Sequence, residues 1–89
     1  MRTIREEKLY EEQIKALRVD WERLDEALSQ RDQALSTIPE QFPIVPGTGN
    51  PGLRRLKLVG FPGVPPLTIF FTFTATEVNL QAAEIIEED

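Results

Sequence analysis

Three basic residues that lie close together in the sequence are the strongest candidates for chemistry in this chain: Arg54, Arg55 and Lys57. Guanidinium and ammonium groups bind phosphates and carboxylates through charge-assisted hydrogen bonds, so this cluster suits contact with RNA or with acidic side chains of a partner. The plainer interpretation is a solvated strand whose charges discourage pairing at a sheet edge. The charge contrast is local, since Glu40 is the one acidic residue between positions 39 and 76.

Residue types that serve proton transfer and metal binding are scarce. The 89 residues include no His, no Cys and a single Tyr, Tyr10. Disulfide bonds and zinc sites built from Cys and His are therefore excluded. The last thirteen residues carry five acids and no base, which is typical of a solvated tail. We expect no metal, no cofactor and no recognisable catalytic set. No apolar run is long enough to span a bilayer, so a soluble cytoplasmic protein is expected.

The first 38 residues contain neither Gly nor Pro and are rich in good helix formers. Apolar side chains recur there at steps of three and four, which indicates an amphipathic helix with one apolar seam. The seam consists of Tyr10, Ile14, Leu17, Trp21, Leu24, Leu28, Leu35 and Ile38. Arg31 occupies the one step of this seam that lacks an apolar residue.

Two arrangements of residues 4–38 fit this pattern. One continuous helix would be roughly 50 Å long, with Thr3 and Glu6 as its capping box. A helix of that length cannot bury its seam on so small a monomer, so it implies a homodimer or another partner. In the second arrangement the chain turns at residues 18–20, Asp20 caps a second helix, and the two helices form a hairpin on the sheet. A compact monomer slightly favours the hairpin.

Two seam residues are also candidates for an interface. Trp21 belongs to a residue type that often dominates binding energy, although on an apolar helical stripe it more often lies in the core. Arg31, as a single charged seam position, would fix register or oligomeric state. Alternatively Arg31 lies where the helix passes the edge of the sheet, with its head group in water.

The second half of the chain reads as a loop followed by strands. Residues 39–52 contain four Pro and three Gly, which predicts an irregular loop. Residues 53–86 show the period of two that is typical of strands, and we expect a three-stranded antiparallel meander there, with an acidic tail at 87–89. The inward positions are expected to be Leu56, Leu58, Leu67, Ile69, Phe71, Phe73, Val78, Leu80 and Ala82. The sequence thus predicts one α+β domain over residues 1–89, with a helix or helical hairpin packed on the meander.

This order of elements resembles the RelE/ParE toxin superfamily of bacterial type II toxin–antitoxin systems. The resemblance covers about residues 10–86 and rests on four short motifs: STIPEQFP, LRRL, TIFFTF and EVNLQAA. It implies a toxin-like protein whose partner is a cognate antitoxin and whose target is the ribosome with its mRNA, or DNA gyrase.

The chain departs from the mRNA-cleaving members of that superfamily, which place basic, Tyr or His side chains near the final strands. Here His is absent, Tyr10 belongs to the helical part, and the sequence ends in the acidic AEIIEED. The resemblance therefore implies a divergent or inactive member, or one that acts by protein contact in the manner of ParE. The alternatives are an mRNA endonuclease that uses Arg54, Arg55 and Lys57, and a non-enzymatic coiled-coil assembly protein.

Overall fold

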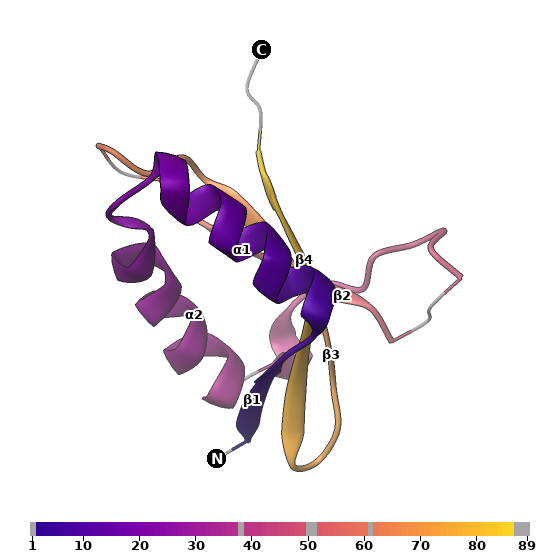
Figure 1. The fold of residues 1–89 in the computed structure, drawn as a ribbon. Coiled ribbons are helices and arrows are strands. Elements are labelled where there is room, and N and C mark those ends of the chain that lie inside the picture. The colour runs from indigo at the N-terminus through magenta and orange to yellow at the C-terminus, as the bar shows by residue number, and fades with distance from the viewer. Residues whose placement is uncertain (1, 38, 50–51, 61, 87–89) are drawn as a thin grey trace.

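The computed structural model describes residues 2–37, 39–49, 52–60 and 62–86. Within them, two helices cover one face of a four-stranded sheet (Figure 1). The elements are β1 (Thr3–Glu6), α1 (Lys8–Asp20), α2 (Leu24–Thr37), the short 3-10 helix η1 (Pro39–Gln41), β2 (Arg54–Leu58), β3 (Leu67–Phe73) and β4 (Glu77–Ile85). The α+β class is confirmed, and the described part of the chain has one strand more than the sequence pattern indicated. Neither of its helices is long and apolar enough to cross a membrane.

The additional strand is β1, which the sequence pattern assigned to the first turn of a helix. It pairs in parallel with β4, from Thr3 opposite Glu77 to Glu6 opposite Leu80. Thr3 and Glu6 are therefore strand residues, and the predicted capping box is wrong. The actual N-cap of α1 is Glu7, whose side chain makes no capping hydrogen bond. Four residues are too few for a periodic signal, and the strand forms because β4 offers it a partner from the opposite end of the chain.

The helical half is a hairpin, so the continuous helix that a coiled-coil homodimer would need is not formed. Asp20 ends α1, and Leu24 begins α2. The predicted role of Asp20 as the N-cap of the second helix is therefore wrong. At the turn, the Trp21 N–H donates to the Leu17 carbonyl (2.9 Å) and the Leu24 N–H donates to the Trp21 carbonyl (3.1 Å). No Gly or Pro marks this break, because folding back is what lets both halves of the seam reach the sheet.

The strand order across the sheet is β1-β4-β3-β2. Both the β2–β3 and the β3–β4 pairs are antiparallel, which confirms the predicted meander. A bulge shifts the β3–β4 register, because Phe70 lies opposite Ala82 whereas Phe71 lies opposite Leu80. The extra residue in β4 reverses the alternation beyond it, so Ala83 is buried in the core. Ala82 lies beside Phe70 on the other face, and its predicted inward position is wrong.

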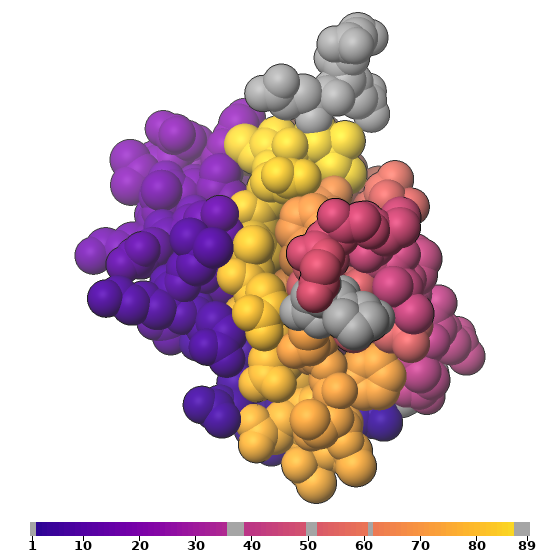
Figure 2. Space-filling model, turned by 90° about the vertical axis from the view of Figure 1, so that its right-hand side faces the viewer, coloured from indigo at the N-terminus to yellow at the C-terminus, as the bar shows by residue number. Residues whose placement is uncertain are grey.

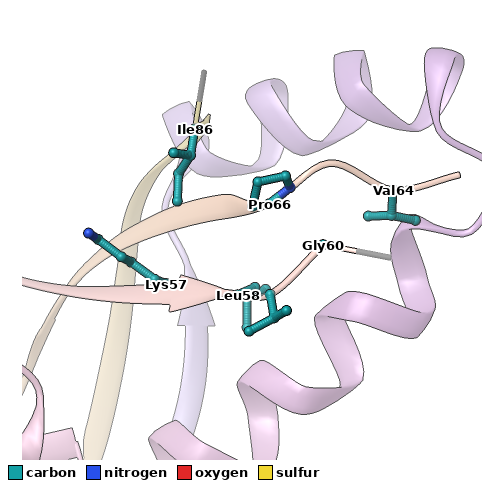
Figure 3. A pocket seen from close by; sticks show the side chains of 7 residues that line it. Lys57, Leu58, Gly60, Val64, Pro66 and Ile86 are labelled. Carbon is teal, nitrogen blue, oxygen red and sulfur yellow. The ribbon is translucent and has the colours of Figure 1, made fainter. Parts of the chain in front are cut away.

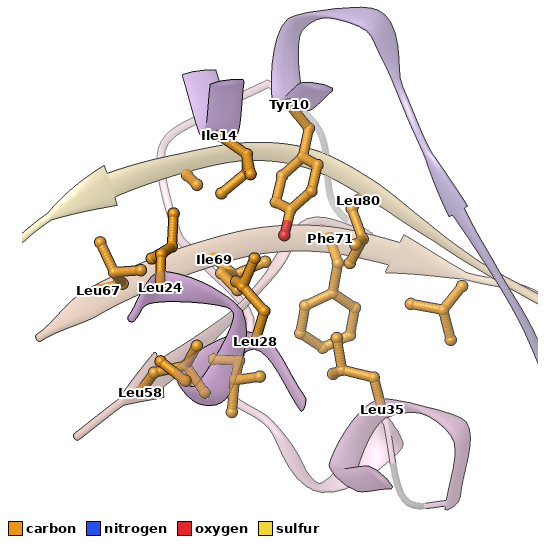
Figure 4. Packing of buried hydrophobic residues seen from close by; sticks show 14 of the residues in the cluster. Tyr10, Ile14, Leu24, Leu28, Leu35, Leu58, Leu67, Ile69, Phe71 and Leu80 are labelled. Carbon is orange, nitrogen blue, oxygen red and sulfur yellow. The ribbon is translucent and has the colours of Figure 1, made fainter. Parts of the chain in front are cut away.

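The core lies between the helices and the inner face of the sheet (Figure 4). Its buried residues are Tyr10, Ile14, Leu24, Ala27, Leu28, Leu35, Leu56, Leu58, Val64, Leu67, Ile69, Phe71, Val78, Leu80 and Ala83. The helical seam and the inward strand positions therefore meet in one cluster, as their periods predicted. Phe73 is partly buried against it. Ile38, the last predicted seam residue, and the predicted acidic tail at 87–89 lie outside the described residues.

The loop between α2 and β2 is tied to the sheet at its base. Ile44 forms a bridge with Arg54. The Val45 N–H donates to the Leu53 carbonyl (2.8 Å), and the Arg55 N–H donates to the Pro43 carbonyl (3.1 Å). The predicted irregular loop at 39–52 is thus held against the outer edge of β2 over a short stretch.

The connection between β2 and β3 requires glycine at Gly60. A Cβ there would lie 2.7 Å from the Pro66 nitrogen and 2.9 Å from the Val64 carbonyl oxygen. Since these are backbone atoms, the turn itself would have to shift, and we expect Gly60→Ala to lower the free energy of unfolding by about 1–3 kcal/mol. Urea denaturation measures this. The control is Val59→Ala at the exposed neighbour, expected within about 0.5 kcal/mol of wild type; equal stability of the two variants would contradict the close approach.

Candidate functional site

The three basic residues singled out from the sequence do not lie on one face of β2. Arg55 and Lys57 are exposed and lie on the face away from the helices, because they alternate with the buried Leu56 and Leu58. Arg54 lies on the inner side and is half-buried. The structure therefore brings Arg55 and Lys57 together and separates Arg54 from them.

Arg54 fastens the loop that follows α2 to the sheet. One guanidinium nitrogen, Nη1, donates to the Phe42 carbonyl (2.7 Å) and to the Glu40 carbonyl (3.2 Å). Its Cζ lies 5.3 Å from the centroid of the Phe73 ring, and the Cζ of Arg2 lies 5.2 Å from the same centroid. These contacts engage the guanidinium inside the protein, so Arg54 has a structural role that the sequence did not reveal.

The surroundings of Arg55 and Lys57 follow from the register of the sheet. Arg55 lies opposite Phe70, and Lys57 lies opposite Thr68, which in turn lies opposite Glu84 of β4. Cross-strand neighbours of this kind have Cβ atoms about 4.5–5.5 Å apart. Glu84 is exposed on the same face as Lys57, so this face carries charges of both signs rather than a basic stripe.

An apolar hollow lies next to Lys57 at the end of the sheet (Figure 3). Besides Lys57 it is lined by Leu58, Val59, Gly60, Val64, Pro66 and Ile86. Val59 is 79% exposed and adds an apolar side chain to this surface. The candidate site is therefore a pair of exposed cations, of which Lys57 borders an apolar hollow. We name it the β2 face, defined by Arg55, Lys57 and Val59.

A second polar cluster joins the two helices inside the molecule. Arg31 donates a hydrogen bond from Nη1 to the Tyr10 hydroxyl, and its Cζ lies 5.7 Å from the centroid of the Tyr10 ring. The same guanidinium is paired with Asp32 at 2.6 Å. Burial raises the pKa of Tyr10 above its ordinary value of 10.0, and the charge of Arg31 offsets part of that effect. The phenol therefore stays neutral and hydrogen-bonded at neutral pH.

This internal cluster corrects the expectation for Arg31. Its side chain is 9% exposed and turns inward to Tyr10, so it does not extend into water at the edge of the sheet. Trp21 is partly buried and packs against the core, as the plainer interpretation of its position predicted. The two interface candidates thus serve packing within the chain, and Tyr10 has no access to the β2 face.

Sequence reasoning missed several polar contacts between distant segments, and two of them involve α1. One is the Tyr10–Arg31 hydrogen bond. The other joins α1 to β4, where Oε1 of Gln13 accepts a hydrogen bond from the Ala83 N–H (2.7 Å). Tyr10 and Arg31 both belong to the seam, which was the available signal, but they face each other only once the seam folds into a hairpin.

Within the described residues, no group of three or more Asp or Glu side chains is arranged to hold a metal ion. Comparison with protein-family models, with curated proteins and with solved structures gave no match to this chain.

Proposed function

We propose that this protein is a toxin-like component of a type II toxin–antitoxin system, which acts by protein–protein contact with a cognate antitoxin and a cellular target. The observation that carries the proposal is the β2 face, where Lys57 borders an apolar hollow and Arg55 lies exposed on the same face of the strand. Protein interfaces combine such elements, with an apolar anchor at the centre and charged groups at the rim that select the partner. The helical hairpin on an antiparallel meander, as the RelE/ParE resemblance implies, is further support.

The charges of the sheet favour a protein over RNA as the partner. Proteins that bind nucleic acid present a basic stripe that neutralises several phosphates. Here Glu84 shares the face with Lys57, and the chain as a whole has a net charge of −5. Two exposed cations, one of them at the border of an apolar hollow, fit acidic and apolar side chains of a partner better than a phosphate backbone.

The distribution of titratable groups favours contact over cleavage. Cleavage of RNA at a ribose hydroxyl requires a group that exchanges protons within reach of the substrate. The guanidinium of Arg55 and the ammonium of Lys57 are hydrogen-bond donors that suit charge stabilisation. The chain contains no His, and its single Tyr lies in the core against Arg31. The proposal therefore assigns binding, not catalysis, to the β2 face.

Induced expression with and without the product of the adjacent reading frame tests this function. We expect growth arrest without the partner, intact mRNA during the arrest, and a complex that co-purifies when both are made. Fragmented mRNA would instead identify an endonuclease, and the absence of arrest and of any co-purifying partner would reject the proposal.

The double variant Arg55→Glu/Lys57→Glu tests the β2 face itself. Charge reversal places acidic groups against an acidic partner, and we expect binding at least about tenfold weaker, equivalent to ~1.4 kcal/mol, with loss of arrest. The matched control is Lys8→Glu/Lys15→Glu, which changes the net charge equally at exposed positions of α1. Equal losses in both double variants would show that only the net charge matters.

A further inference from the structure

The second half of β4 has a free backbone edge. β1 pairs with β4 only from Glu77 to Leu80, whereas β4 continues to Ile85. The chain of β1 leaves the sheet at Glu7, whose N–H donates to the Leu80 carbonyl (2.9 Å), and α1 begins directly after it. Among the described strands, none lies beside residues 81–85 on this side.

Ala83 and Ile85 present their backbone groups to this edge. The Ile86 N–H donates to the Pro66 carbonyl (2.9 Å), which lies on the β3 side. Successive strand residues turn their backbone groups to opposite edges, so those of Ile85 and Ala83 turn away from β3. The Ala83 N–H is in fact bonded to Oε1 of Gln13, which takes the place that a strand carbonyl would have.

An apolar hollow lies beside the free edge. It is lined by Gln13, Ala16, Leu17, Ala83, Glu84 and Ile85, between α1 and β4. In the space-filling view, β4 lies at the surface between α1 and β3 (Figure 2). Leu9, four residues before Gln13 on α1, is 55% exposed and extends the apolar border. An added strand would therefore find backbone partners along the edge and an apolar surface on its helix side.

The charges of β4 indicate which strand fits. β4 contains Glu77 and Glu84 and no basic residue, so a second copy of β4 would bring like charges together. Ile85 lies on the helix side with the hollow, while Glu84 lies on the outer face of the sheet. Successive side chains of an added strand would therefore face the apolar hollow and Glu84 alternately.

We propose that this edge binds an extended peptide segment of a partner protein, in which apolar residues alternate with basic ones. The segment adds as a strand beside residues 81–85, its carbonyl replaces Oε1 of Gln13 at the Ala83 N–H, and its basic side chains pair with Glu84. The edge belongs to β4, two strands away from β2, so the inference is independent of the function proposed for the β2 face.

The test uses the full chain and a capped peptide of about eight residues in which Val and Lys alternate, a length typical of strands. Fluorescence anisotropy measures affinity, and amide hydrogen exchange locates the site. We expect binding that slows exchange at Ala83 and Ile85, and at least tenfold weaker binding of a peptide with Glu in place of Lys. Binding without added protection at these amides, or self-association of the chain that protects them, overturns the proposal.

The decisive variant is Gln13→Ala. It removes the side chain that competes for the Ala83 N–H, so the Val/Lys peptide is expected to bind about three- to tenfold more tightly. Unchanged or weaker binding of the peptide to this variant would show that Gln13 does not compete with it for the Ala83 N–H, which rejects the inference. A peptide N-methylated on the residues that pair with β4 is expected to lose binding, and equal binding of this peptide also rejects it. These two arms do not depend on a variant of β4 folding correctly.

Discussion

Replacing Phe71 by alanine is expected to lower the free energy of unfolding by about 3–5 kcal/mol, the range typical of buried aromatic residues. Phe71 is fully buried at the centre of the sheet. Its ring meets that of Phe42 edge to face, with centroids 5.9 Å apart (Figure 4 shows Phe71 among the core residues). Domains of this size are stable by only about 5–15 kcal/mol, so this one substitution removes a large share. Urea denaturation followed by circular dichroism measures the loss.

The matched control for Phe71→Ala is Phe70→Ala. The two residues have the same chemistry and are neighbours in β3, but Phe70 is half-buried on the opposite face, beside Arg55. We expect Phe70→Ala to cost less than half as much, since less apolar surface returns to water. A larger cost for Phe70 than for Phe71 would show that the two faces of the sheet are assigned the wrong way round.

The second large effect is expected for Tyr10→Phe, which removes only the hydroxyl that accepts from Arg31. A hydrogen bond to a charged group contributes about 1.5–3 kcal/mol, and we expect a loss of that size in the free energy of unfolding. The double variant Tyr10→Phe/Arg31→Met replaces the whole pair by apolar groups and is expected to recover part of the loss. A double-mutant cycle with strictly additive effects would contradict a direct interaction.

The pH dependence of stability gives an independent check on Tyr10. Because burial raises the pKa of Tyr10 above 10.0, the folded state favours the protonated phenol. This contribution is fully present below pH 10.0 and is lost as the pH rises through the folded-state pKa. Tyr10→Phe should lack this loss in the same window. Tyr10 is the one tyrosine of the chain, so tyrosinate absorbance follows its ionisation without overlap from other tyrosines.

The local periods of the sequence predicted much of the fold. The alternation in β2 and β3 correctly placed Leu56, Ile69 and Phe71 in the core and Arg55 and Lys57 outside it. This succeeded because the burial of a strand residue depends on its own position in a period of two, a property that a few neighbours define. The helical seam was identified for the same reason.

The candidate site was predicted only in part. Arg55 and Lys57 were named from their charge and alternation, but the apolar hollow beside Lys57 requires Val64, Pro66 and Ile86 to meet beside β2. The inner role of Arg54 depends on a loop from another part of the chain. The free edge of β4 depends on where a separate strand, β1, ends. None of these features leaves a local mark in the sequence.

By itself, the sequence determined the α+β class, the apolar seam, the meander and the outward position of two cations. The tertiary structure decided that residues 3–6 are a strand, that the seam folds back between Asp20 and Leu24, that Arg31 turns inward, and that a bulge exchanges Ala82 for Ala83 in the core. The physical reason is the same in each case. Propensity and period act between residues a few positions apart, whereas these features depend on hydrogen bonds and packing between segments that only the folded chain brings together.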